Sequence, residues 1–157
     1  NYSKINQFIQ GQRSLNEQFT QSYRPELRTN FSDAPNLRLR YRYSISDNNQ
    51  GSSSTKFVTN APSIDFDAYI WKAVTFQTDF TYTNQDDGVN PSQSFKTWDA
   101  SLSYRKSEGS KWEYEIKATN LLDIDSRVTN SANNLSVINS ETFIQPRFVT
   151  FRIRYEI

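Results

Sequence analysis

Apolar and polar residues alternate with a period of two along almost the whole chain, and this pattern constrains the fold more than any other feature. About seven long runs show the alternation, and no segment shows the 3.6-residue period of an amphipathic helix. Because successive side chains of a strand point to opposite faces, each run predicts a strand with one apolar and one polar face. The runs cover residues 15–31, 37–46, 63–71, 74–82, 98–105, 112–119 and 149–157.

The composition excludes several classes of function. The chain has 157 residues, of which 15% are aromatic, and it contains no Cys, His or Met. Disulfides, Cys/His zinc sites, cysteine nucleophiles and Ser–His–Asp triads are therefore absent. A net charge of +1 gives no electrostatic basis for binding nucleic acid. We expect no covalent catalysis, no metal and no cofactor.

Alternation of this kind fits either a soluble β-sandwich or a transmembrane β-barrel. Three features favour the barrel. The runs reach about ten residues, where ordinary strands have five or six. Aromatic residues gather near strand ends on the apolar parity, where a membrane barrel places its aromatic girdles. The polar parity is rich in Ser, Thr, Asn, Gln, Asp and Arg, as in a hydrogen-bonded lumen. The mean hydropathy of −0.79 also fits, because only alternate residues of a barrel strand face lipid.

The connections between runs alternate in length. Short turns are expected at 32–36, 71–73 and 107–110, and longer loops at 47–54, 84–91 and 123–139. Outer-membrane barrels place their short turns in the periplasm and their long loops outside the cell. Pro25 interrupts the first run and predicts a sheet edge or a bulge, because proline cannot donate to the ladder.

The final run keeps its apolar parity to the last residue of the chain. This pattern resembles the C-terminal strand that the outer-membrane assembly machinery recognises, although that strand usually ends in Phe. Its apolar residues, which we expect to form the assembly signal, are Val149, Phe151, Ile153, Tyr155 and Ile157.

Two motifs upstream of this strand sharpen the resemblance. The segment Ala118–Asp123, with sequence ATNLLD, is similar to the element that closes the penultimate strand of TonB-dependent outer-membrane receptors. The segment Gln145–Val149, with sequence QPRFV, is similar to the start of their final strand. The order of the two motifs and their distance from residue 157 fit as well. The resemblance covers residues 36–157 well and 1–35 loosely.

The resemblance implies a barrel of about 22 strands that is filled by a plug domain and imports scarce large solutes. The cargo would be a siderophore, vitamin, glycan or peptide. Residues 1–14 would then be an extracellular loop or the end of a preceding strand, and residues 15–157 the C-terminal part of the barrel. The implied location is the outer membrane of a Gram-negative cell, with the C-terminus in the periplasm.

The resemblance also implies a set of partners. They are outer-membrane lipid, the protein's own plug domain and remaining barrel strands, TonB through an N-terminal segment, the barrel-assembly machinery, and a surface lipoprotein lid. The cargo cannot be identified from this segment. The outer-loop residues Phe95, Lys96, Asn133 and Asn134 are candidates for contact with ligand or with a lid.

Charges on the polar parity are expected to pair across strands and to face the lumen. One group brings Arg38, Arg40 and Arg42 near Asp65 and Asp67. A second group brings Glu113 and Glu115 near Arg152 and Arg154. Opposite charges that face each other across strands contribute roughly 0.2–1 kcal/mol per pair. Structural ion pairing is the simpler interpretation of these residues, ahead of contact with substrate.

Two other functions stay open. A complete barrel of eight strands with a structural or adhesive role would need residues 1–12 to form a strand that pairs with the last one. A soluble β-sandwich, acting as a binding or glycosidase-like domain, would use a carboxylate pair, Asp65/Asp67 or Glu113/Glu115. The segment Asp86–Gly88 is suited to calcium or, more simply, to a plain turn.

Overall fold

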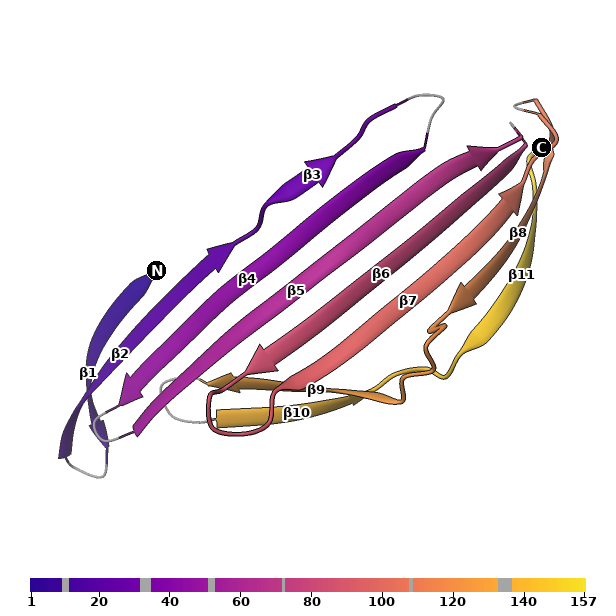
Figure 1. The fold of residues 1–157 in the computed structure, drawn as a ribbon. Coiled ribbons are helices and arrows are strands. Elements are labelled where there is room, and N and C mark those ends of the chain that lie inside the picture. Colours follow the sequence, from indigo (N-terminus) through magenta and orange to yellow (C-terminus); the bar gives the residue numbers. More distant parts are fainter. Residues whose placement is uncertain (10–11, 32–34, 51–52, 72, 108, 133–136) are drawn as a thin grey trace.

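The computed structural model describes residues 1–9, 12–31, 35–50, 53–71, 73–107, 109–132 and 137–157. Within these ranges the chain is all-β, with antiparallel pairing throughout and no helix (Figure 1). The strands are β1 (Tyr2–Ile9), β2 (Gln12–Tyr23), β3 (Glu26–Arg28), β4 (Asn36–Gln50), β5 (Ser53–Ile70), β6 (Val74–Asp86), β7 (Gln93–Tyr104), β8 (Trp112–Thr119), β9 (Ser126–Ala132), β10 (Val137–Phe143) and β11 (Phe148–Tyr155).

One large sheet contains nine of these strands. Eight of them follow one another in the order β1-β2-β4-β5-β6-β7-β8-β11, and β3 pairs with β4 beside β2. The sheet is open, because β1 and β11 lie at its opposite edges and do not pair with each other within the described residues (Figure 1). The prediction of antiparallel all-β structure is therefore confirmed, and the closed barrel stays a prediction.

Pro25 lies in the short break between β2 and β3. The registers Tyr23↔Tyr43 and Glu26↔Arg40 share one offset, so the ladder continues past the break without an inserted residue. The outer side of this segment has no neighbouring strand among the described residues, because the pairing of β1 with β2 ends near Phe19. The expected edge is thus present, and proline sits there at no cost to a second ladder.

Three expected loops are wrong in extent. Residues 47–50 and 53–54 belong to β4 and β5, which pair to the end of the hairpin, as in Gln50↔Ser53. The stretch 84–91 begins inside β6, which runs to Asp86. The stretch 123–139 contains most of the hairpin of β9 and β10. Backbone ladders form independently of side-chain polarity, so polar segments without alternation can still be strands. The short turns at 32–36, 71–73 and 107–110 include residues 32–34, 72 and 108, which lie outside the described residues.

On β7 and β8 the two faces are inverted relative to a water-soluble protein. The apolar face of these strands carries alternating aliphatic and aromatic side chains, and most of these are more exposed than the polar ones. On β8, Ile116 is 49% exposed, whereas the side chains of Glu113 and Glu115 are only 21% and 17% exposed. On β7, Leu102 and Tyr104 are exposed in the same way. On these two strands the polar face is therefore the more sheltered side, whereas on β6 Gln77 and Asp79 are exposed and Phe76 and Phe80 are half-buried.

Few side chains are buried, and most of those lie on the polar face. The buried residues are Phe57, Ala61, Ala68, Asn16, Asn48 and Asn120. Phe57 and Ala61 share the polar parity of β5 with Ser63 and Asp65, whereas Ala68 belongs to the apolar parity. No second layer covers the apolar face within the described residues, since the only other sheet, β9 and β10, contacts the polar face.

Candidate ligand-binding face

The polar face carries rows of charged side chains that run across the strands. The first expected group is partly brought together. Both carboxylate oxygens of Asp65 accept hydrogen bonds from Nη2 of Arg40, at 2.8 and 2.7 Å. Arg38 lies opposite Asp65 in the register but forms its ion pair with Glu26, at 3.6 Å. Asp67 accepts a hydrogen bond from the Asn36 amide at 3.3 Å instead of pairing with an arginine.

Arg42 is the member of this group that the structure leaves without a carboxylate. Its neighbour on β5 is Ala61, and no ion pair to Arg42 is present in the described part of the chain. On its other side the shared ladder offset of β2 and β3 places Arg24 opposite Arg42. The predicted proximity of Arg42 to Asp65 and Asp67 is therefore wrong, because the register places Arg42 two rows from Asp65 and three rows from Asp67.

The second expected group forms as two cross-strand pairs. Arg152 lies opposite Glu115, with 3.1 Å between Nη1 and Oε2. Arg154 lies opposite Glu113, at 3.4 Å. Each carboxylate of the Glu113/Glu115 pair is thus engaged by an arginine, as the structural interpretation of these charges expects. The pairs also fix the register of β11 on β8.

A row of three aspartates follows the ladder across β5, β6 and β7. Asp79 lies opposite Asp65 on one side and opposite Asp99 on the other. Like charges that face each other across strands are destabilising. Asp65 is offset by Arg40, and Asp99 accepts a hydrogen bond from the backbone N–H of Asn120 at 2.9 Å. The row is a local concentration of negative charge on the polar face, and no group of side chains suited to a metal ion occurs among the described residues.

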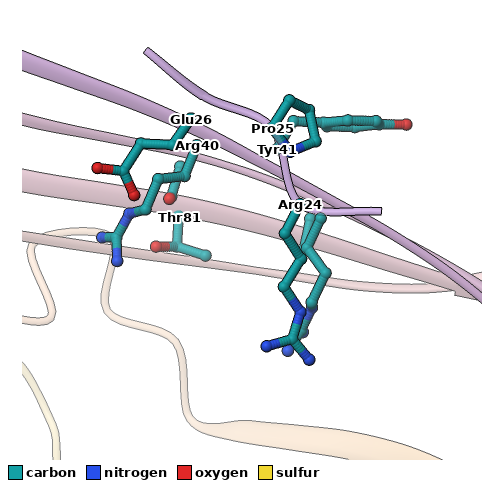
Figure 2. A pocket seen from close by; sticks show the side chains of 9 residues that line it. Arg24, Pro25, Glu26, Arg40, Tyr41 and Thr81 are labelled. Atoms are coloured by element: carbon teal, nitrogen blue, oxygen red, sulfur yellow. The ribbon is translucent and has the colours of Figure 1, made fainter. Parts of the chain in front are cut away.

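Cavities hollow the polar face among the described residues. The cavity in Figure 2 has a volume of about 360 Å³, and its lining includes Arg24, Glu26, Arg40, Arg42, Ala61, Ser63 and Thr81. Figure 2 shows Arg24, Glu26 and Arg40 extending to one side of the strands, whereas Pro25 and Tyr41 lie together on the other. A second cavity of about 310 Å³ lies between Arg28, Arg38 and the aspartates.

The third cavity lies under the hairpin of β9 and β10 and has a volume of about 300 Å³. Its lining combines Arg42 with Thr83, Gln85 and Phe95 of the large sheet and with Arg127 of β9. Arg42 therefore borders two cavities, one on each side of the row that runs across the strands through Arg24, Arg42 and Ala61.

The hairpin is held on the polar face by specific contacts. The side-chain amide of Gln85 donates to the carbonyl of Asn130 and its oxygen accepts from the N–H of Asn130, both at 2.8 Å. The guanidinium of Arg127 lies 5.1 Å from the centre of the Phe95 ring. The hairpin thus forms a wall over the end of β6 and β7. Of the four residues predicted to contact a ligand or lid, Phe95 contacts this wall, and Nζ of Lys96 lies 5.8 Å from the centre of the Tyr82 ring. Asn133 and Asn134 lie outside the described residues.

The segments 118–123 and 145–149 meet in space. Asn120, buried and with φ of 51°, donates to the carbonyls of Ile124 and Gln145 at 2.9 and 3.0 Å. Its oxygen accepts from the N–H of Ile124 at 3.0 Å. Asp123 accepts from the backbone N–H of Arg147 at 3.1 Å and pairs with its guanidinium at 3.8 Å. The motifs therefore brace the end of β8 against the start of β11, with the hairpin emerging between them.

The connection from β6 to β7 is a self-contained turn. Asp87 accepts hydrogen bonds from the side chain and backbone of Asn90 and from the backbone of Val89, and these bonds hold the pKa of its carboxyl below the ordinary value of 3.8. Asp86 accepts from the N–H of Gly88, whose φ is +71°. The oxygens that calcium would need are engaged in the turn itself, so the plain turn is the arrangement observed.

Several residues of this face were not singled out by sequence pattern. Arg24 faces Arg42, a relation that follows from the antiparallel pairing of β2 and β3 with β4. Gln85 and Arg127 gave no such signal, because both lie in polar stretches without alternation. Asn120 was part of a recognised motif, but its role as a brace between two motifs depends on tertiary contacts.

Comparisons of the chain with models of protein families, with curated proteins and with solved structures found no match. Across the part of the chain that the structure describes, no helix has the length and apolar character to cross a membrane.

Proposed function

We propose that this chain forms part of the wall of a TonB-dependent outer-membrane transporter that binds and imports a scarce large solute. The exposure of apolar side chains on β7 and β8 is the observation that supports the proposal most directly. A strand that exposes its leucine and isoleucine side chains more than its glutamates is stable where lipid, not water, meets the apolar face. Strands β4 to β7 have 12 to 18 residues, more than the 9–11 that a tilted strand needs to cross a bilayer.

Aromatic side chains support the same orientation. Tyr104, Trp112, Tyr114 and Tyr155 form a cluster on the apolar face, with 4.7 Å between the ring centres of Trp112 and Tyr155. Trp71, 87% exposed, lies at the turn from β5 to β6, which the ladder places at the same end of the sheet. Such residues are enriched at lipid–water boundaries because their rings are part apolar and part polar. This end carries the short turns and would face the periplasm.

The braced motifs support the transporter over other barrels. The contacts of Asn120 and Asp123 link the two segments whose sequences resemble the TonB-dependent family. In this proposal the open edges of β1 and β11 pair with barrel strands outside the chain, and the polar face lines the lumen beside the plug. The exposed apolar side of Val149, Phe151, Ile153, Tyr155 and Ile157 faces lipid and serves as the assembly signal.

A matched pair of lysine substitutions tests contact with lipid. Leu102 on the apolar face and Ser101 on the polar face are neighbours on β7, so only the face differs. A lysine on a lipid-facing site costs about 2–4 kcal/mol at the bilayer midplane and about 0–1 kcal/mol near the interface, and Leu102, two residues from Tyr104, should lie between these values. We expect Leu102→Lys to reduce the fraction of the full protein that folds into lipid vesicles, read as a heat-shifted gel band. Ser101→Lys should fold like the wild type. Equal folding of both variants, or a wild-type protein that is monodisperse in plain buffer, would refute the membrane location.

A complete eight-stranded barrel is the second candidate, and the path of eight paired strands favours it. Residues 2–9 do form a strand, as this alternative requires, but β1 pairs with β2 while its other edge stays apart from β11 in the structure. The reading frame upstream of Asn1 separates the candidates. Several hundred further residues that include a plug support the transporter, whereas a signal peptide directly before Asn1 supports the small barrel.

A further inference from the structure

Four arginines of the polar face form no ion pair among the described residues; three of them gather in one part of the face, and the fourth, Arg28, borders the second cavity. Most arginines there form ion pairs, as Arg40 does with Asp65 and Arg152 with Glu115. Among the described residues, Arg24, Arg42 and Arg127 line the two cavities that flank one row, and no acidic group lies within ion-pair distance of them. Arg24 donates only to the Ser22 hydroxyl, at 3.3 Å, and Arg127 lies over the Phe95 ring.

The pairing of the strands brings two positive charges together, and this repulsion is unfavourable unless a negative charge offsets it. Arg24 and Arg42 occupy directly opposed positions on β2–β3 and β4, and like charges in such positions repel. The next position in the row is Ala61, which offers no charge, and the third cavity adds only the hydroxyls and amides of Thr59, Thr83 and Gln85 near Arg42. The row therefore lacks the negative charge that Glu26 supplies to the adjacent row, where it lies opposite Arg40.

The two cavities have the size of a small-molecule site. Their volumes are about 360 and 300 Å³, at the lower end of the range for ligand pockets. Arg42 borders both, with Arg24 on one side and Arg127 on the other. Arg127 is held in place by the hairpin, which Gln85 fixes through two hydrogen bonds to Asn130. The guanidinium groups thus come from the break between β2 and β3, from β4 and from β9.

We propose that Arg24, Arg42 and Arg127 bind a soluble anion that carries carboxylate or phosphate groups, within the two cavities that share Arg42. Guanidinium forks suit both groups, because their paired N–H donors match two oxygens of one carboxylate or phosphate. Three guanidiniums favour a ligand with at least two negative groups. This proposal rests on the proposed function for the claim that the anion is cargo, and it names the class of that cargo. The site itself depends only on the arrangement of the sheet and the hairpin.

Calorimetric titration of the full protein tests the site with two probes, inorganic phosphate and succinate, at constant ionic strength. We expect saturable binding by the wild type, and a loss of affinity of about tenfold or more for Arg42→Gln, because a hydrogen bond to a charged group is the interaction removed. Arg24→Gln and Arg127→Gln should each weaken binding as well. Arg42→Lys keeps the charge but not the fork, so its affinity should fall between those of the wild type and Arg42→Gln.

Arg154→Gln is the matched control, because Arg154 lies on the same face but is paired with Glu113. Its affinity for the probes should stay within about twofold of the wild type, because its guanidinium is already engaged. The heat-shifted gel band verifies that every variant is folded. Absence of binding by the folded wild type would overturn the proposal, as would an equal loss in Arg154→Gln and Arg42→Gln, since that would show a diffuse charge effect.

The outcome separates this proposal from the proposed function. A protein that fractionates with the outer membrane and binds neither probe refutes the anion site and leaves the transporter proposal standing. A protein that purifies without detergent and loses its binding with Arg42→Gln refutes the transporter proposal and supports the site. Phosphate and succinate titrated separately show whether phosphate or carboxylate is the preferred group.

Discussion

Replacement of Asn120 should destabilise the chain more than replacement of any exposed asparagine, because this buried side chain makes three hydrogen bonds and has a positive φ. A net hydrogen bond contributes about 1 kcal/mol, so removal of the amide costs about 3 kcal/mol in Asn120→Gly. Alanine loses the same bonds and adds about 1 kcal/mol, because its Cβ disfavours the left-handed region that asparagine and glycine tolerate. We therefore expect losses of about 3 kcal/mol for glycine and about 4 kcal/mol for alanine.

Equilibrium unfolding in urea, followed by tryptophan emission of the protein in detergent, measures these losses. With a slope of about 2 kcal/mol per molar urea, the midpoint should fall by about 1.5 M for Asn120→Gly and about 2 M for Asn120→Ala. Asn139→Ala is the control, because Asn139 is an exposed residue of β10 whose side chain makes no hydrogen bond in the described part of the chain. Its effect should lie within about 0.5 kcal/mol. Equal midpoints for Asn120→Ala and Asn139→Ala would refute the brace, and a glycine variant less stable than the alanine variant would refute the role of φ.

Two further predictions concern the hairpin and the turn. Gln85→Ala should remove both hydrogen bonds to Asn130 and speed hydrogen exchange at the Asn130 amide by at least tenfold. Gln77→Ala is the control, because Gln77 lies on the same face of β6 but away from the hairpin, and it should leave that rate unchanged. Unchanged exchange in Gln85→Ala would show that other contacts hold the hairpin. The lowered pKa of Asp87 means that its contribution to the turn is fully present above the ordinary value of 3.8 and is lost as the pH falls through the lower folded value. Amide NMR shifts of Val89 and Asn90 should follow that titration in the wild type and stay flat in Asp87→Asn, and a wild-type midpoint at or above 3.8 would contradict the hydrogen bonds described here.

The fold followed from sequence wherever the two faces of a strand meet different surroundings. On β7, β8 and β11 the alternation is clean, and the facing pairs Glu113 with Arg154 and Glu115 with Arg152 occur in the register that the parities require. Alternation disappears where both faces are polar, as at the hairpin ends of β4 and β5 and in β9. The sequence therefore predicted loops at these segments. Their ladders are backbone interactions that side-chain pattern does not report.

The candidate site was harder to predict from the sequence, because it depends on which arginines lack a carboxylate neighbour and on the register between β4 and β5. The sequence places Arg38, Arg40 and Arg42 on one parity, but only the ladder shows that Arg42 lies opposite Ala61 while Arg40 reaches Asp65. Arg127 reaches the same cavity through a hairpin whose position is fixed by Gln85. Neither relation is periodic, so neither leaves a trace in the spacing of residues.

One edge of β11 pairs with no strand among the described residues, and this free edge affects the behaviour of the purified protein. Its backbone N–H and C=O groups point outward beside a row of bare aromatic and branched side chains, which is a template that any extended peptide can extend. Molecules released from their native surroundings should therefore join through this seam and form oligomers. A lysine placed on the seam, or a proline at a non-bonded position, would be the first change to try when soluble aggregates limit a preparation.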